Sequence, residues 1–148
     1  MANNEEYRPG SGNPEEKLIL IVEDDESVWD LLYYMVRKEG FKTEKASDGK
    51  EALDKARILH PQLILLDLML PKCGGFEIAR ELQEGDTSAI PIVIVSSRNL
   101  DRSTSELLKQ EPNVKDFIEK PVKPQVLAAL LHTLLKTRPP VKEEKKEP

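Results

Sequence analysis

The sequence predicts a doubly wound α/β fold, in which a five-stranded parallel sheet carries helices on both faces. Two observations lead to this prediction. Short apolar runs of strand length alternate with segments whose apolar residues recur at helical spacing, and the alternation occurs five times between about residues 18 and 138. Several of these runs are apolar throughout, which is typical of strands buried on both faces.

The first three strands and two helices are predicted in order along the chain. Residues 18–22 are a continuous apolar run, and residues 43–46 and 63–66 are predicted as the next two strands. A helix before Gly40 is predicted because glycine is favoured just after a helix C-terminus, and residues 50–59 form a second helix. The apolar stripe of the first helix consists of Val28, Leu31, Leu32, Met35 and Val36.

The second half of the chain continues the alternation. Residues 76–82 are predicted as a short helix, and residues 92–95 as an apolar strand. A polar helix follows at about 101–110, and residues 115–118 form the last strand. The final helix, at 126–135, is strongly apolar, so we expect it to pack against the sheet.

Composition divides the chain into three parts. Residues 1–17 hold prolines, glycines and four glutamates, and they bury too little apolar surface to offset their ordering entropy, so we expect a flexible leader. Residues 18–138 form the predicted domain. Residues 139–148 alternate in charge and are expected to be a charged disordered tail or a linker. A length of 148 residues suits one such domain.

Charge and residue usage exclude several classes of protein. The 22 Lys and Arg residues against 27 Asp and Glu residues give a net charge of −5, and from this we expect no direct DNA binding. No apolar run approaches the ~18 residues of a membrane helix, and the N-terminus is no signal peptide, so we expect a cytoplasmic protein without a membrane partner. The single cysteine, Cys73, excludes an intramolecular disulfide framework and a cysteine-based zinc site.

Polar residues stand at the carboxyl ends of the predicted strands, which meet at one edge of a parallel sheet. A carboxylate cluster without histidine or thiol selects a hard divalent cation, Mg²⁺ first. A lysine and a hydroxyl beside such a cation could hold a phosphoryl group, and an aspartate between them could attack phosphorus. The residues are Glu23, Asp24 and Asp25 after the first strand, Asp67 after the third, Ser96 and Ser97 after the fourth, and Lys120 after the fifth.

Four blocks, LILIVEDDESV, LILLDLMLPKCGGFE, IPIVIVSSR and DFIEKPV, resemble the signature blocks of the two-component response-regulator receiver domain. They occur in the same order and at compatible spacing from Leu18 to about Lys136. The resemblance implies the (βα)5 flavodoxin-like receiver fold. It also implies a phosphoacceptor signalling domain rather than an enzyme, one that catalyses only its own phosphoryl transfer and dephosphorylation.

The resemblance implies a role for each residue at the predicted acidic edge. Asp67 would accept a phosphoryl group from a phosphohistidine. Glu23 and Asp24 would hold Mg²⁺ together with Asp67 and the backbone carbonyl of Met69. Asp25 lies one residue beyond the metal pair, and we expect it to begin the following helix as a favourable N-terminal charge.

The same resemblance assigns the groups that sense the phosphoryl group. Ser96 would hydrogen-bond it, and Lys120 would pair with one of its oxygens. The Lys120–Pro121 peptide bond is cis in the family. Phe117 occupies the aromatic switch position, where tyrosine is commoner, and it would turn inward when Ser96 moves.

Partners follow from the same resemblance. We expect a sensor histidine kinase or a histidine phosphotransfer protein as the phosphoryl donor. Because only ten residues follow Arg138, we expect a stand-alone, chemotaxis-type receiver with a downstream protein target. Its apolar surface would allow a phosphorylation-dependent dimer. Trp29 and Tyr33, spaced i, i+4 off the apolar stripe, are either a docking patch for the donor or ordinary boundary aromatics.

Alternative functions remain beside this interpretation. The chain could be the receiver fragment of a larger regulator or hybrid kinase, or a docking module that does not use phosphate. A haloacid-dehalogenase-type phosphohydrolase would need a second acid two residues after its nucleophile, where this chain has Met69. A flavodoxin-like electron carrier would need a Ser/Thr/Gly-rich phosphate loop where this chain has the acidic run EDDES.

Overall fold

The computed structural model describes residues 10–70, 74–97 and 100–141 and contains one five-stranded parallel sheet, so the predicted fold class is confirmed. The strands lie in the order β2-β1-β3-β4-β5, and every neighbouring pair runs parallel. They are β1 (Leu18–Val22), β2 (Lys42–Ala46), β3 (Leu63–Asp67), β4 (Ile92–Ser96) and β5 (Val114–Glu119).

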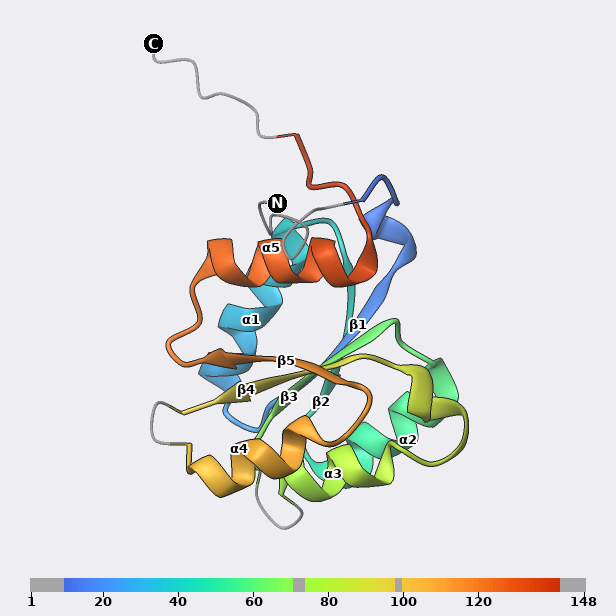
Figure 1. Cartoon of the computed structure of the whole chain (residues 1–148). Coiled ribbons are helices and arrows are strands. Elements are labelled where there is room, and N and C mark those ends of the chain that lie inside the picture. The colour runs from blue at the N-terminus through green and yellow to red at the C-terminus, as the bar shows by residue number, and fades with distance from the viewer. Residues whose placement is uncertain (1–9, 71–73, 98–99, 142–148) are drawn as a thin grey trace, which may run out of the picture.

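Within the described residues, five α-helices form the two outer layers (Figure 1). One face of the sheet is covered by α1 (Glu26–Lys38) and α5 (Pro124–Leu135). The other face is covered by α2 (Gly49–Leu59), α3 (Gly75–Glu81) and α4 (Arg102–Lys109). The described residues also include two short 3-10 helices, η2 (Pro14–Glu16) and η3 (Gly85–Ala89). No helix in the described part of the chain is long and apolar enough to span a bilayer.

The sheet separates two apolar cores because successive side chains of a strand point to opposite faces. In β1, Ile19 and Ile21 pack toward α1 and α5, whereas Leu20 and Val22 pack toward α2, α3 and α4. The strands β1, β3 and β4 are buried along their lengths, with only Leu18 partly exposed. This burial explains why their sequences are apolar throughout rather than alternating.

The segment before β1 differs from the expected flexible leader over residues 10–17. Gly12 forms a parallel bridge with Thr137, just after α5, and Pro14 is buried. The bridge consists of backbone hydrogen bonds, which almost any sequence can form, so composition does not predict it. The domain boundary at residue 17 stays a prediction.

The burial of the central strands predicts that alanine substitutions of a buried and of an exposed side chain of equal size differ greatly in their effect on stability. Leu65→Ala removes a side chain that is 1% exposed in β3, so we expect a loss of about 2–5 kcal/mol in the free energy of unfolding. Ile58→Ala removes a side chain that is 75% exposed, and its effect should stay within about 0.5 kcal/mol. Urea unfolding measures both values, and equal losses would contradict the two-layered core.

Candidate functional site

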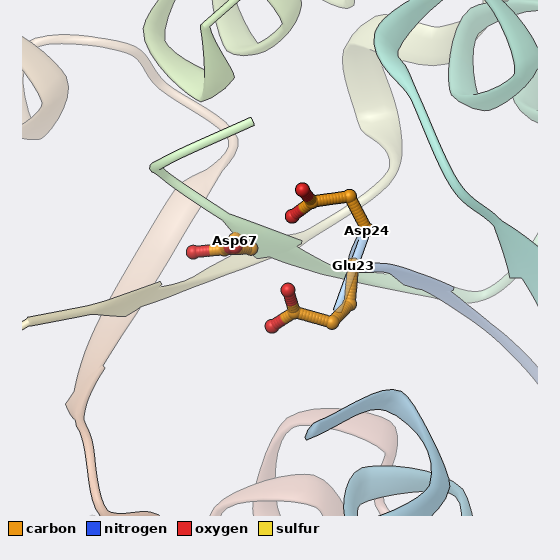
Figure 2. Close-up of side chains that lie close together, drawn as sticks. All are labelled: Glu23, Asp24 and Asp67. Carbon is orange, nitrogen blue, oxygen red and sulfur yellow. The ribbon is translucent and has the colours of Figure 1, made fainter. Parts of the chain in front are cut away.

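Three carboxylates lie together at the carboxyl edge of the sheet. Glu23 and Asp24 directly follow β1, and Asp67 is the last residue of β3, the strand that pairs with β1. One carboxylate oxygen from each residue lies within 4.8 Å of the others. Figure 2 shows the three carboxyl groups gathered beyond the ends of these strands. Glu23 and Asp67 are buried, whereas Asp24 is exposed.

Lys120 brings a positive charge to this acidic cluster. Its Nζ lies 3.3 Å from Oε1 of Glu23 and 3.5 Å from Oδ1 of Asp67. Its backbone N–H donates to the carbonyl of Ser96 at 2.8 Å, which ties the end of β5 to the end of β4. The Lys120–Pro121 bond is cis, as the resemblance implies. Burial lowers the pKa of Lys120, but the Asp67 and Glu23 carboxylates outweigh it and raise the pKa above its ordinary value.

Glu23 holds its proton unusually firmly. Burial raises its pKa to about 7, and the hydrogen bond and negative charge of Asp67 act in the same direction. The N–H of Asp25, 3.2 Å from Oε2 of Glu23, and the charge of Lys120 oppose this shift without cancelling it. Near neutral pH, therefore, Glu23 is partly protonated, and a cation could replace that proton.

Asp25 points away from this cluster and caps helix α1. Its Oδ1 accepts hydrogen bonds from the N–H groups of Ser27 and Val28 at 2.9 and 3.2 Å, and from the Ser27 hydroxyl at 2.7 Å. The hydroxyl bond is the main cause that lowers the pKa of Asp25, so this carboxylate stays charged at the positive end of the helix. The structure thus gives Asp25 the helix-capping place expected from its position.

Ser96 and Phe117 lie on the neighbouring strands β4 and β5. Ser96 is the buried last residue of β4, and Phe117 is a partly buried residue of β5. The Lys109 Nζ of α4 lies 5.9 Å from the centre of the Phe117 ring. A hollow between β4, β5 and α4 is lined by Ser96, Leu100, Lys109 and Phe117. The side chain of Phe117 therefore borders a space that continues to Ser96.

Met69 follows Asp67 by two residues and is mostly exposed. Its backbone N–H donates to Oδ1 of Asp67 at 3.2 Å, and its side chain is 71% exposed. The hydrogen bond fixes the orientation of the Asp67 carboxylate. The proposed metal contact of the Met69 carbonyl stays a prediction.

Gly75, the first residue of α3, supports the site and was not singled out from the sequence. A Cβ at this position would lie 2.7 Å from the carbonyl oxygen of Asp67 and 2.7 Å from Cα of Leu68. Only glycine permits this close approach of α3 to the end of β3. The pair of adjacent glycines, Gly74 and Gly75, soon after the end of β3 is the sequence feature that could have pointed to this close approach.

Trp29 and Tyr33 pack on each other rather than standing as separate exposed rings. Their ring centres lie 4.9 Å apart, and the Lys45 Nζ lies 4.7 Å from the centre of the Trp29 ring. Trp29 also packs partly against the core beneath α1. These contacts favour the boundary interpretation for Trp29. Cys73 lies outside the described residues.

Comparison with known proteins identifies the family. Residues 19–132 match the response regulator receiver domain, so the chain belongs to that family, whose members are signalling modules. The chain is 36% identical over 120 residues to the alkaline phosphatase synthesis transcriptional regulatory protein PhoP of Bacillus subtilis, covering 81% of this chain and 49% of PhoP. It is 38% identical over 118 residues to the DNA-binding response regulator MtrA of Mycobacterium tuberculosis, covering 80% of this chain and 50% of MtrA.

Solved receiver domains have the same fold. The receiver domain of a signal transduction histidine kinase from Syntrophus aciditrophicus is 30% identical, with a TM-score of 0.72 over 80% of this chain and 89% of that one. The receiver domain of a sensor histidine kinase from Pseudomonas aeruginosa is 25% identical, with a TM-score of 0.73 over 82% and 98% of the two chains. The latter holds a magnesium ion coordinated in its active-site cleft.

These relatives correct one expectation. The chain spans about half the length of the curated relatives it matches, and one of them is a DNA-binding response regulator. The expectation that excluded DNA from the partners is therefore wrong. It was drawn from the net charge of this chain, and the charge of a receiver domain carries no information about a separate DNA-binding part of a longer protein.

The donor set fits a magnesium ion. The cluster offers oxygen atoms from Glu23, Asp24 and Asp67, and no histidine or cysteine among the described residues belongs to it. Hard divalent cations prefer such oxygen ligands. A cation would also offset the negative charge of Asp67, which adds to the effect of burial in raising the pKa of Glu23.

The raised pKa of Glu23 predicts how the metal-free domain loses stability with pH. The folded pKa of about 7 exceeds the ordinary value of 4.5, so the folded state binds more protons than the unfolded state between these values. This contribution to stability is complete at low pH and is lost as pH rises through about 7. In urea unfolding without divalent cations, wild type should lose stability relative to Glu23→Gln between about pH 5 and pH 8. The prediction is contradicted if the free energy of unfolding of wild type, minus that of Glu23→Gln, stays constant or rises over this pH range.

Proposed function

We propose that Asp67 accepts a phosphoryl group from a phosphohistidine on a sensor histidine kinase or a histidine phosphotransfer protein. The observation that carries this proposal is the position of the Lys120 ammonium, within 3.5 Å of both Asp67 and Glu23, at the edge where three carboxylates meet. An isolated surface carboxylate has no such environment. Donor and receiver must share one compartment, which we propose is the cytoplasm.

The proposed transfer is a simple displacement at phosphorus. An Asp67 carboxylate oxygen attacks the phosphorus atom, the bond from phosphorus to the imidazole nitrogen breaks, and its electron pair returns to the imidazole ring. The product is an aspartyl phosphate. A Mg²⁺ ion bound by Glu23, Asp24 and Asp67 would supply charge neutralisation between the carboxylates and the phosphoryl oxygens.

The residues of the chain orient and receive the new charge. The Met69 N–H holds the Asp67 carboxylate, and Lys120, whose pKa is raised, remains charged and pairs with a phosphoryl oxygen. Phosphorylation replaces the single negative charge of the Asp67 carboxylate with a phosphoryl group that carries about two negative charges beside Lys120. The proton of Glu23 must leave before or during cation binding, so we expect cation binding to be favoured as pH rises through about 7.

The same charge would act as a switch. In this proposal the phosphoryl oxygens attract the Ser96 hydroxyl, Phe117 turns into the space that Ser96 leaves, and the surface formed by α4 and β5 changes. The hollow that joins Ser96 to Phe117 supports this path. The phosphoryl group thereby shifts an equilibrium between two conformations and alters the surface that binds protein. A docking module without phosphate chemistry would not need the complete set of Asp67, Lys120 and carboxylates.

The relatives favour a second candidate for the output. Because this chain spans about half of MtrA, a DNA-binding response regulator, we propose that the receiver can control a DNA-binding part in a longer polypeptide. The mass of the native polypeptide isolated from its source cells distinguishes the candidates. A polypeptide of roughly twice this length supports control of such a part, and a polypeptide of this length contradicts it.

The central role of Asp67 can be tested by phosphoryl labelling. After incubation with a small phosphodonor and Mg²⁺, wild type should gain the mass of one phosphoryl group, because the nucleophile and its positive partner are already together. Asp67→Asn should gain none, since an amide cannot form the acyl phosphate. Omission of Mg²⁺ should suppress the gain. An equal gain in Asp67→Asn would place the chemistry elsewhere.

Lys120→Ala should separate phosphorylation from the switch. We expect the variant to keep Mg²⁺ binding, because the carboxylates remain, but to lose the coupling between the phosphoryl group and Phe117. NMR of the Phe117 ring before and after phosphorylation reports the coupling. Lys123→Ala, an exposed lysine three residues later, is the matched control and should respond as wild type does. A full Phe117 response in Lys120→Ala would refute the role of the lysine.

A further inference from the structure

Two segments from opposite ends of the described chain meet at the edge of the domain opposite the acidic cluster. In Figure 1 the blue segment before β1 lies beside the red segment after α5. Gly12 pairs in parallel with Thr137. The N–H of Gly12 donates to the carbonyl of Lys136 at 2.9 Å, and the N–H of Arg138 donates to the carbonyl of Gly12 at 2.8 Å. This is the hydrogen-bond pattern of a parallel sheet, limited to one residue.

The approach of the two segments depends on small residues. A Cβ on Gly12 would lie 2.8 Å from the carbonyl oxygen of Lys136, and a Cβ on Gly10 would overlap with the same carbonyl group. Lys136 itself has a φ of 55°, in the left-handed region, which turns the chain at the end of α5. The Arg138 guanidinium adds a hydrogen bond to the carbonyl of Ser11 at 3.2 Å. Glycine at positions 10 and 12 therefore permits contacts that any larger residue would disturb.

A buried histidine connects this pairing to the rest of the domain. Thr137 is fully buried, and its hydroxyl oxygen lies 2.7 Å from Nδ1 of His132 in α5. The other ring nitrogen, Nε2, lies 2.9 Å from Oε1 of Glu39, which follows α1. Because the Glu39 carboxylate only accepts, Nε2 carries the proton, and in the neutral ring Nδ1 accepts from the Thr137 hydroxyl. The His132 ring also packs against Phe41, with centres 5.0 Å apart.

Helix α5 joins this pairing to the candidate site. It begins at Pro124, four residues after Lys120, and ends at Leu135, directly before the paired segment. A helix of 12 residues spans about 18 Å. Its apolar side packs on the sheet through Leu127, Leu130 and Leu131. One rigid element therefore has one end beside the phosphoryl site and the other end at the point where the chain leaves the domain.

We propose that residues 10–12 act as a clasp that fixes the path of residues 136–138. With the clasp closed, the chain after Arg138 leaves the domain in a direction set by α5, so a displacement of α5 is passed on to whatever that chain contacts. Without the clasp, residues 136–138 would lose their backbone partners and the exit would become flexible. The clasp is independent of phosphoryl transfer, because none of its residues belongs to the candidate site.

Native-state hydrogen exchange of the full chain tests the clasp directly. The amides of Gly12 and Arg138 donate the two hydrogen bonds of the pairing, so both should be protected, with protection factors that agree within about threefold because they open together. Gly12→Ala should lower both protection factors on the order of tenfold or more. Ser11→Ala is the matched control, since only the backbone oxygen of Ser11 takes part, and it should leave both unchanged.

A second measurement is the rate at which trypsin cleaves after Lys136. The side chain of Lys136 is exposed, but the clasp holds the following bond, so cleavage should accelerate on the order of tenfold in Gly12→Ala and remain slow in Ser11→Ala. Protection of β3 amides and phosphoryl labelling of Asp67 should be unchanged in both variants, which shows that the domain itself is intact. Unprotected Gly12 and Arg138 amides in wild type, or protection that survives Gly12→Ala, would overturn the proposal.

Discussion

The carboxylates of Glu23, Asp24 and Asp67 repel one another, yet the parallel pairing of β1 with β3 gives their backbones no freedom to separate. Two unit charges about 4 Å apart interact by roughly 4 kcal/mol at the effective dielectric constant of a protein surface. The domain offsets this repulsion with the Lys120 ammonium and with a proton on Glu23. A cation could replace the proton, and a phosphoryl oxygen could become a further partner of the Lys120 ammonium. The affinity of the site for a cation follows from this constraint, which is that paired strands hold carboxylates together.

The same constraint explains why the site is connected to distant surfaces. Lys120 and Ser96 are held together by a backbone hydrogen bond between the ends of β5 and β4. Beyond Ser96 lies the hollow that Phe117 borders, and beyond Lys120 lies the start of α5. In the proposed switch, a charge change at Lys120 would act on both strands and reach the surface of α4 and β5 through side-chain packing. By the proposed clasp, it would also reach the opposite edge through the length of α5.

The sequence was sufficient for features that depend on local pattern. Continuous apolar runs predicted β1, β3 and β4 because burial on both faces leaves no place for polar residues. The acidic residues at the ends of β1 and β3 predicted that Glu23, Asp24 and Asp67 lie together. The sequence was insufficient for features that depend on backbone contacts between distant segments, or on parts of a longer polypeptide. The pairing of Gly12 with Thr137 uses only backbone groups, and the need for Gly75 arises from the distance between α3 and β3. The DNA-binding relatives extend over sequence that this chain does not contain.

The most direct test of the account is to identify the residue that carries the phosphoryl group. Borohydride reduces an acyl phosphate of aspartate to homoserine, which remains in the peptide and can be located by tandem mass spectrometry. Homoserine is expected at position 67 after treatment with phosphodonor and Mg²⁺, and none is expected there when either is omitted. Homoserine at another aspartate, or an unmodified Asp67 in protein that has gained a phosphoryl group, would contradict it.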